Sequence, residues 1–326
     1  RQLPRRATAK VLAGTLQPEA PGVDAAEGRW WAWRGHRIRY VALGDGPPVL
    51  LVHGFGASAD YFRKLLPALA AEGYSAYAVD LLGLGRSEKA AGEDYSIRLW
   101  AEQVQDFCQE VLPAGRAPVL VGNSFGSLVA LAAAAGEWGR AGGVRGLALL
   151  NCAGGMNTRH MATDDLTPQP LKTAAAAVTG LLNVLLSWRA FAAWFFDRVK
   201  TEDNVREVLR GIYTNKEAVD DELVRGVLAP ADDEGALDVF VKILTGNPGP
   251  SPEKLMPSVQ CPVKLVWGDA DTFTPVDGAY GKYFHDLAEV REDVSFTIVE
   301  AGHCLHDDNA PAVHAAVLPW LAALPG

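Results

Sequence analysis

Short apolar runs alternate with helical patterns along most of this chain of 326 residues, and this alternation restricts the fold more than any other feature. The run Pro48–Val52 is apolar throughout, as expected for a strand that is buried on both faces. Strands that alternate with helices form a mostly parallel sheet joined by right-handed crossovers. The sequence therefore predicts an α/β protein built on one such sheet.

The individual elements are predicted from their periodicity and from the turn residues between them. Glu27–Trp33 and His36–Ala42 alternate on either side of Arg34-Gly35, which predicts a hairpin. After Pro48–Val52, we expect strands at Ser75–Val79, Pro118–Val121, Val144–Leu150, Pro262–Trp267 and Val294–Val299. We expect helices near Asp60–Glu72, Leu99–Val111, Phe125–Glu137, Asp277–Leu287 and Ala310–Leu324.

The alternation stops in the middle of the chain. From about Ala153 to Met256 the sequence has helical patterns and few strand patterns. An interruption between two strands of one sheet is typical of an inserted cap. We therefore expect a core made of residues 26–152 and 257–326, a helical cap, or lid, at residues 153–256, and a basic flexible tail at residues 1–25.

Charge and cysteine content exclude several classes of function. The formal net charge is −9, whereas binding to a nucleic-acid backbone needs clustered Lys and Arg. The four cysteines lie far apart and show neither metal-ligand spacing nor a disulfide framework; they are Cys108, Cys152, Cys261 and Cys304. We expect no metal and no organic cofactor.

The N-terminal tail leaves two interpretations open. It carries Arg1, Arg5, Arg6 and Lys10 and no acidic residue before Lys10. Such a composition is typical of a remnant of an organellar transit peptide, but a disordered basic tail explains it equally well. No run in the sequence reaches the roughly 20 apolar residues that a membrane-spanning helix needs.

A candidate nucleophile lies at Ser124. Gly122-Asn123-Ser124-Phe125-Gly126 follows an apolar strand and opens a helix, which is the context in which G-x-S-x-G forms a nucleophile elbow. The sharp turn lifts the serine hydroxyl above the sheet edge, at a helix N-terminus that favours a developing oxyanion. An aspartate here would have indicated dehalogenase or epoxide hydrolase chemistry, whereas serine indicates acyl transfer.

Candidate partners of Ser124 follow the last two strands, in the chain order Ser, Asp, His expected for the α/β-hydrolase fold. The loop Gly268–Pro275 offers two carboxylates, Asp269 and Asp271. The loop after Val294–Val299 offers His303 as the base. His306 is a competing histidine, which we expect to cap or line the entrance to the site.

Two further glycine-rich segments follow strands. In His53-Gly54-Phe55-Gly56 we expect the Phe55 N–H to donate to the oxyanion, together with the Phe125 N–H next to the nucleophile. His53 itself is expected to be structural. The segment Asp80–Ser87 lacks the third glycine of a dinucleotide-binding loop, so we interpret it as a structural turn.

The apolar segment Ala174–Phe196 bears on the substrate. Its large apolar residues recur at helical spacing and predict one continuous face; those assigned to substrate binding are Leu181, Leu185, Trp188, Phe191 and Phe195. This face either packs the cap, lines a wall for a long apolar substrate, or contacts a membrane interface. The last two interpretations favour a hydrophobic ester as substrate.

Several segments resemble the chlorophyll dephytylases, chloroplast members of the α/β-hydrolase superfamily. The resemblance runs from about Trp30 to Trp320 and includes the cap. The segments that carry it are Leu120–Ala130 (LVGNSFGSLVA), Leu150–Asn157 (LNCAGGMN), Phe195–Lys200 (FFDRVK), Glu234–Leu255 (EGALDVFVKILTGNPGPSPEKL), Val276–Phe284 (VDGAYGKYF) and Ala301–Asp308 (AGHCLHDD).

The resemblance implies a catalytic triad of Ser124, Asp271 and His303, with the acid second in G-D-x-D-x-x-x-P. It also implies cleavage of the phytyl ester of chlorophyll, giving chlorophyllide and phytol, by an enzyme peripheral to the thylakoid membrane of the chloroplast. Three alternatives stay open: a pheophytinase-like esterase for magnesium-free pigment, a lipase or carboxylesterase of membrane lipids, and a non-catalytic ligand-binding relative.

Overall fold

The computed structural model describes residues 28–136 and 143–325, and it is organised around one eight-stranded sheet. The strand order is β1-β2-β4-β3-β5-β6-β7-β8, antiparallel between β1, β2 and β4 and parallel from β4 to β8. The strands are β1 (Arg29–Trp33), β2 (His36–Leu43), β3 (Pro48–Val52), β4 (Ser75–Val79), β5 (Val119–Asn123), β6 (Gly146–Leu150), β7 (Val263–Gly268) and β8 (Val294–Val299). The predicted mostly parallel sheet is confirmed.

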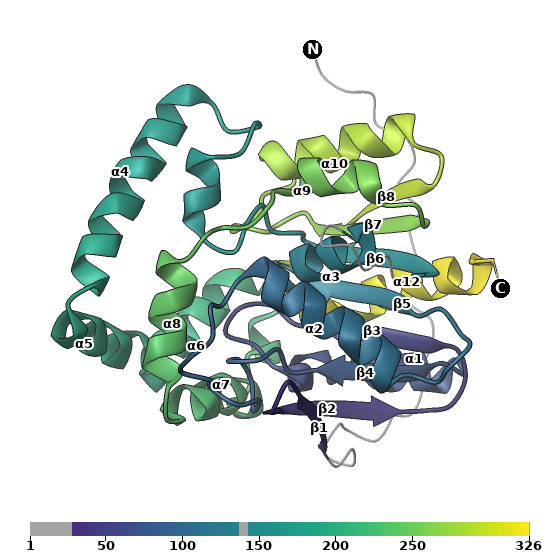
Figure 1. Ribbon diagram of the computed structural model, residues 1–326. Coiled ribbons are helices and arrows are strands. Elements are labelled where there is room, and N and C mark those ends of the chain that lie inside the picture. Colours follow the sequence, from purple (N-terminus) through teal and green to yellow (C-terminus); the bar gives the residue numbers. More distant parts are fainter. Residues whose placement is uncertain (1–27, 137–142, 326) are drawn as a thin grey trace.

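Helices cover both faces of this sheet and bury one apolar core on each side (Figure 1). One core includes residues of α2 (Ile97–Glu110), α3 (Phe125–Ala135) and α10 (Ala279–Val290). The other core includes residues of α1 (Leu65–Ala71) and α12 (Ala310–Ala323). The central strands β3 to β7 are buried along their whole length, which explains why their sequences are continuous apolar runs.

The first hairpin forms as its sequence predicts. Trp33 pairs with His36, so Arg34 and Gly35 make a two-residue turn. Both turn residues have positive φ, 51° and 86°, which matches the right-handed twist of the two strands. The predicted tail, residues 1–25, lies outside the described residues.

The predicted helix Asp60–Glu72 is wrong as a single element. The structure has a short 3₁₀ turn, η2 (Ala59–Phe62), and then α1, which begins at Leu65. Pro67 explains the restart, because proline has no N–H to donate and is tolerated only in the first turn of a helix.

Residues 153–256, between β6 and β7, contain helices and no strand. We call the part from α4 to α8 the helical insertion; its elements are α4 (Gln169–Leu186), α5 (Arg189–Val199), α6 (Glu202–Ile212), α7 (Asp221–Leu228), η5 (Ala229–Asp232) and α8 (Ala236–Thr245). In Figure 1, α4 and α5 lie at the periphery, farther from the sheet than α6 and α8. The described residues also include short helices at Thr158–Ala162 (η3), Lys216–Ala218 (η4), Pro252–Leu255 (α9), Met256–Ser258 (η6) and Leu305–Asp308 (α11).

The single helical face predicted for Ala174–Phe196 is wrong. Helix α4 ends at Leu186 and α5 begins at Arg189, and the two axes differ by 107°. Trp188 takes the N-cap position of α5, with an extended backbone. The apolar residues before and after this break therefore point in different directions.

Candidate active site

Four loops meet at the edge of the sheet where its parallel strands end. The loop after β3 carries Phe55, the turn after β5 carries Ser124, and the loops after β7 and β8 carry Asp271 and His303. Because parallel strands present their carboxyl ends at one edge, residues far apart in the sequence come together there.

Ser124 occupies a strained turn between β5 and α3. Its φ is 55° and its ψ is −122°, outside the regions that non-glycine residues ordinarily adopt. The flanking glycines make the turn feasible. A Cβ on Gly122 would lie 2.4 Å from the Gly126 carbonyl oxygen, and one on Gly126 would lie 2.1 Å from the Val52 carbonyl oxygen. Only glycine fits at either position, which is the physical reason for the spacing in the motif.

Ser124, His303 and Asp271 form a continuous hydrogen-bonded chain. The His303 Nε2 atom lies 2.7 Å from the Ser124 Oγ atom, and the Nδ1 atom lies 2.8 Å from an Asp271 carboxylate oxygen. The carboxylate accepts a hydrogen bond from the Nδ1–H group, which leaves the unprotonated Nε2 atom free to take the serine proton. The geometry therefore suits removal of a proton from Ser124.

Asp271 is buried and held as a carboxylate. Burial works to raise the pKa of this group, but the hydrogen bond and charge of His303, followed by hydrogen bonds from Thr274, lower the pKa below the usual aspartate value. The Thr274 hydroxyl donates to the oxygen that faces His303, at 2.5 Å, and the Phe273 N–H donates to the other oxygen, at 2.8 Å. Asp269 is exposed and accepts instead from the Ala301 N–H, at 3.2 Å.

The His303 loop is fixed by an asparagine that the sequence analysis did not select. Asn151 follows β6, is fully buried, and has a φ of 49°. Its side-chain amide donates to the carbonyl oxygens of Gly302 and His303, at 3.0 and 2.9 Å, and its oxygen accepts from the Gly268 N–H, at 2.8 Å. One side chain thus joins the ends of three neighbouring strands. The only sequence signal was an asparagine directly after a buried strand, where left-handed backbone is common.

His306 is not at the entrance, so that expectation is wrong. Its side chain is 1% exposed and its ring lies 4.8 Å from the ring of Phe62. Burial lowers the pKa of His306 to about 4, which keeps the imidazole neutral near pH 7. The short helix α11 turns this side chain into the protein, whereas His303 just before it faces Ser124.

The helical insertion is joined directly to the His303 loop through a buried carboxylate. Asp308 accepts from the N–H groups of Gly302, at 2.6 Å, and Thr214, at 2.9 Å. Thr214 follows α6, and the last carbonyl of that helix, at Ile212, accepts from the His303 N–H at 2.8 Å. The position of the candidate base therefore depends on the end of α6.

A neighbouring ion-pair cluster strengthens this junction. Arg63 of the core binds Asp307 through its Nε atom, at 2.9 Å, and Asp220 of the insertion, at 2.6 Å. Burial opposes ionisation of Asp307, but Arg63 outweighs it and lowers the pKa of the carboxyl. The bridge to α7 contributes less than the buried pair, because the Asp220 side chain is 45% exposed and its charge is solvated.

The two residues expected to donate to the oxyanion, Phe55 and Phe125, both belong to segments that lie next to Ser124. Phe125 is the first residue of α3, so its N–H has no acceptor within the helix. Phe55 follows Gly54, where an added Cβ would lie 3.4 Å from the Ser124 Cβ atom. His53 supports this loop: its Nδ1 atom bonds the Gly54 carbonyl oxygen at 2.8 Å, and its Nε2 atom accepts from the Leu81 N–H at 3.1 Å.

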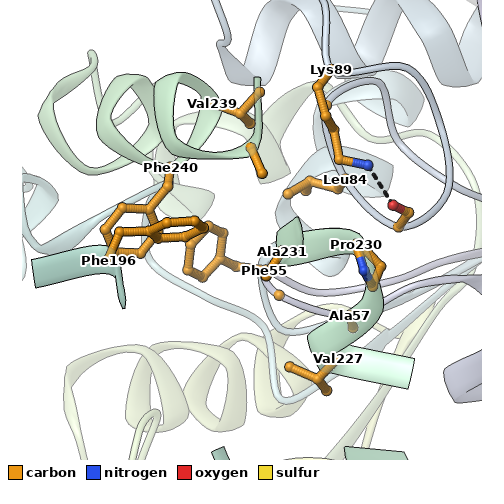
Figure 2. Close-up of a pocket in the computed structure, with 14 residues that line it drawn as sticks. Phe55, Ala57, Leu84, Lys89, Phe196, Val227, Pro230, Ala231, Val239 and Phe240 are labelled. Atoms are coloured by element: carbon orange, nitrogen blue, oxygen red, sulfur yellow. Dashed lines mark hydrogen bonds between the residues drawn. The ribbon is translucent and has the colours of Figure 1, made fainter. Parts of the chain in front are cut away.

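An apolar cavity opens beside Phe55, between the core and the helical insertion (Figure 2). Phe196 of α5 and Phe240 of α8 line it from the insertion. None of the five residues assigned to substrate binding in Ala174–Phe196 lines this cavity; Phe196, one position further along, does.

Those five residues divide into two groups. Leu181 and Trp188 are strongly exposed, at 61% and 69%, and lie on the surface. Leu185, Phe191 and Phe195 are partly buried, and Phe191 stacks on Phe195 with ring centroids 6.2 Å apart. Their part in substrate binding stays a prediction. Within residues 28–136 and 143–325, no three His, Cys, Asp or Glu side chains are grouped to hold a metal ion.

Comparisons with known proteins agree with this geometry. Residues 49–316 match the sequence profile of the Alpha/beta hydrolase family. The chain is 24% identical to the chloroplastic pheophytinase of Arabidopsis thaliana, over 97% of this chain and 71% of that protein. It is 26% identical to the magnesium-chelatase 30 kDa subunit of Rhodobacter capsulatus, over 90% of each chain. The solved epoxide hydrolase CorEH shares the fold, with a TM-score of 0.71, 21% identity, and coverage of 91% of this chain and 98% of that one. The chain therefore belongs to the alpha/beta hydrolase family.

Proposed function

We propose that this protein is a serine carboxylic-ester hydrolase that removes phytol from chlorophyll. The observation that carries the reaction type is the hydrogen-bonded chain from Ser124 through His303 to Asp271. A serine at the elbow supports ester hydrolysis through an acyl-enzyme rather than the chemistry of the epoxide hydrolases and haloalkane dehalogenases to which the chain is also similar.

The geometry supports the following sequence of steps. Ser124 Oγ attacks the ester carbonyl carbon while His303 Nε2 takes its proton. The N–H groups of Phe55 and Phe125 stabilise the tetrahedral oxyanion. His303 then protonates the alcohol oxygen, phytol leaves, and the pigment's propionate carbonyl stays bound to Ser124. A water molecule, deprotonated by His303, attacks this acyl-enzyme and releases chlorophyllide.

Two observations support a phytylated pigment as the substrate. The similarity to a pheophytinase extends over 97% of the chain and therefore includes the helical insertion. The cavity beside Phe55 is lined mainly by apolar side chains, as a hydrocarbon substrate requires. The pheophytinase similarity also makes pheophytin the second candidate substrate.

Incubation with purified pigments tests this proposal. We expect chlorophyll a in mild detergent to yield chlorophyllide and phytol, detected by chromatography, with no product from the Ser124→Ala variant. If pheophytin a gave product and chlorophyll a gave none, the substrate would be the magnesium-free pigment. Cleavage of p-nitrophenyl acetate without any pigment product would leave a serine esterase that acts on other lipids, and no cleavage of any ester would favour the ligand-binding alternative.

We also propose that the protein acts in the chloroplast, peripherally on the thylakoid membrane, and that α4 contacts the lipid. Of the 18 residues of α4, only Thr179 and Leu186 are buried, and Lys172 is its one charged residue. Exposed apolar side chains on a helix with so little charge favour the interface of a bilayer. Among the described residues, no single helix is long and apolar enough to cross a membrane, although α4 and α5 together have the length and composition of a bent span.

Serine replacement of the three most exposed apolar side chains near the break, Leu181, Val184 and Trp188, is expected to weaken binding to thylakoid-lipid vesicles by about tenfold or more. Vesicle sedimentation measures the effect. A matched variant replaces two exposed apolar side chains of α10 and β8, Val290 and Ile298, with serine and should bind like the wild type. Equal loss of vesicle binding in both variants would mean that any exposed apolar surface adheres to lipid. Unchanged vesicle binding in the α4 variant would mean that α4 does not contact the membrane.

A further inference from the structure

The cavity beside Phe55 is built from segments of both the core and the helical insertion. From the core come the loop after β3, with Phe55 and Ala57, and the loop after β4, with Leu84. From the insertion come residues of α5, α7, η5 and α8. The cavity has about 460 Å³ of empty space, part of which is open to solvent.

Aromatic rings form one wall of this cavity. The ring centroids of Phe196 and Phe240 are 5.0 Å apart, and those of Phe55 and Phe240 are 6.2 Å apart. Figure 2 shows these three rings grouped together, with Val227, Pro230 and Ala231 nearby. The wall therefore continues from the insertion to the residue whose N–H we assign to the oxyanion hole.

Among the described residues that line the cavity, Lys89 is the one charged residue, and the protein itself neutralises it. The Lys89 Nζ atom donates to the carbonyl oxygens of Gly85 and Ser87, at 2.6 and 2.9 Å, and pairs with Asp233 at 2.8 Å. Figure 2 shows the nitrogen directed at the carbonyl oxygen of the adjacent loop. What Lys89 offers to a ligand is its aliphatic stem.

The apolar lining of the cavity suits the hydrocarbon chain of an ester better than its polar part. Sites for polar ligands place a few polar groups to fix the ligand's orientation. Here Lys89, the charged member of the described lining, already has three partners within the protein. A tetrapyrrole ring carries carbonyl groups and a metal ion that would lose their solvation in such a lining. A flexible hydrocarbon chain needs no oriented partner and gains from burial alone.

We propose that this cavity holds the phytyl chain of the alcohol, with the chain passing over the Phe55 ring as it leaves the ester oxygen. This inference rests on the proposed ester hydrolysis at Ser124, and it adds where each half of the substrate lies. The chain occupies the cavity of Phe55, Phe196 and Phe240, and the pigment ring stays outside it.

Two pairs of pigment-free esters test the proposal in detergent micelles. Ethyl acetate and phytyl acetate share an acyl group and differ in the alcohol. p-Nitrophenyl acetate and p-nitrophenyl palmitate share the alcohol and differ in the acyl chain. The wild type should prefer phytyl acetate over ethyl acetate in kcat/KM, and phytol should inhibit it competitively.

Filling the cavity should remove that preference. Ala231, in η5, lines the cavity and is half-buried, whereas Ala229 in the same turn is exposed and does not line it. We expect Ala231→Phe to lower the ratio of kcat/KM for phytyl acetate to kcat/KM for ethyl acetate by about tenfold or more. The same substitution should weaken inhibition by phytol to a similar extent. Ala229→Phe should leave both quantities unchanged. Val227→Phe fills the cavity from α7 and repeats the test if the first variant does not fold.

The outcomes separate this inference from the proposed function. Unchanged phytyl acetate preference in both filled variants would overturn it, and so would a loss confined to p-nitrophenyl palmitate, because that result places the acyl chain in the cavity. If the filled variants lose the phytyl preference but the wild type cleaves no pigment, the chain subsite stands and the pigment assignment fails.

Discussion

Replacing Ser124 with Ala is expected to lower kcat for ester hydrolysis by about 10⁵- to 10⁶-fold, because the variant has no oxygen to form the acyl-enzyme. The expected effect on stability is small. The hydroxyl makes one side-chain hydrogen bond, to His303, and the strained φ of 55° is a property of the backbone turn, which alanine retains. We expect the free energy of unfolding to change by no more than about 1 kcal/mol. Initial rates with p-nitrophenyl acetate, together with urea unfolding, measure both quantities.

A second serine, in the first turn of α3, provides the matched control. Ser127 is fully buried, and its hydroxyl donates to the Gly122 carbonyl oxygen at 2.7 Å and accepts from the Leu150 N–H at 3.1 Å. Ser127→Ala should therefore destabilise the fold by about 1–3 kcal/mol, since buried groups lose a partner, while the folded molecules stay active. Ser124→Ala should show the reverse pattern. Turnover near the wild-type rate in Ser124→Ala would exclude Ser124 as the nucleophile.

The sheet could be predicted because each strand is marked by a pattern within its own few residues. Pro48–Val52, Ser75–Val79 and Val294–Val299 have the same bounds in the sequence prediction and in the structure. Each run consists mainly of apolar or β-branched residues and is followed directly by a polar residue, which is His53, Asp80 or Glu300. The turn at Ser124 was equally local, because the glycines that permit it are two residues away on either side.

The remaining features depend on packing between distant segments. Phe55 and Phe240 line one cavity although they are 185 positions apart in the sequence, and no periodicity relates the two positions. The break at Trp188 replaces a continuous helical pattern because α5 packs against α8, through Phe196 and Phe240. The direction of the His306 side chain is set by the one-turn helix α11. A helix this short has no repeating pattern of apolar residues from which that direction could be predicted. Long-range contacts of this kind leave no local pattern in one sequence.

The choice between Asp271 and Asp269 could not be made from spacing alone, because both follow the same strand. The structure places the Asp271 carboxylate 2.8 Å from the His303 Nδ1 atom and the Asp269 carboxylate on the Ala301 N–H. Three further hydrogen bonds hold Asp271 in place as an acceptor, from the hydroxyl and N–H of Thr274 and from the N–H of Phe273. A carboxylate so fixed sets the imidazole tautomer that serine activation requires.

Asp271→Asn is accordingly expected to lower kcat by about 10⁴-fold, because an amide N–H facing Nδ1 favours the tautomer that carries its proton on Nε2, where Ser124 must deliver its own. Asp269→Asn is the matched control: it changes the same charge two residues away and should keep kcat within a few-fold of the wild type. Rates with p-nitrophenyl acetate at pH 7 measure both variants, and circular dichroism checks their folding. If Asp269→Asn lost activity to the same extent while remaining folded, the orienting role would belong to the loop's total charge, and the hydrogen bond from His303 to Asp271 would not be its source.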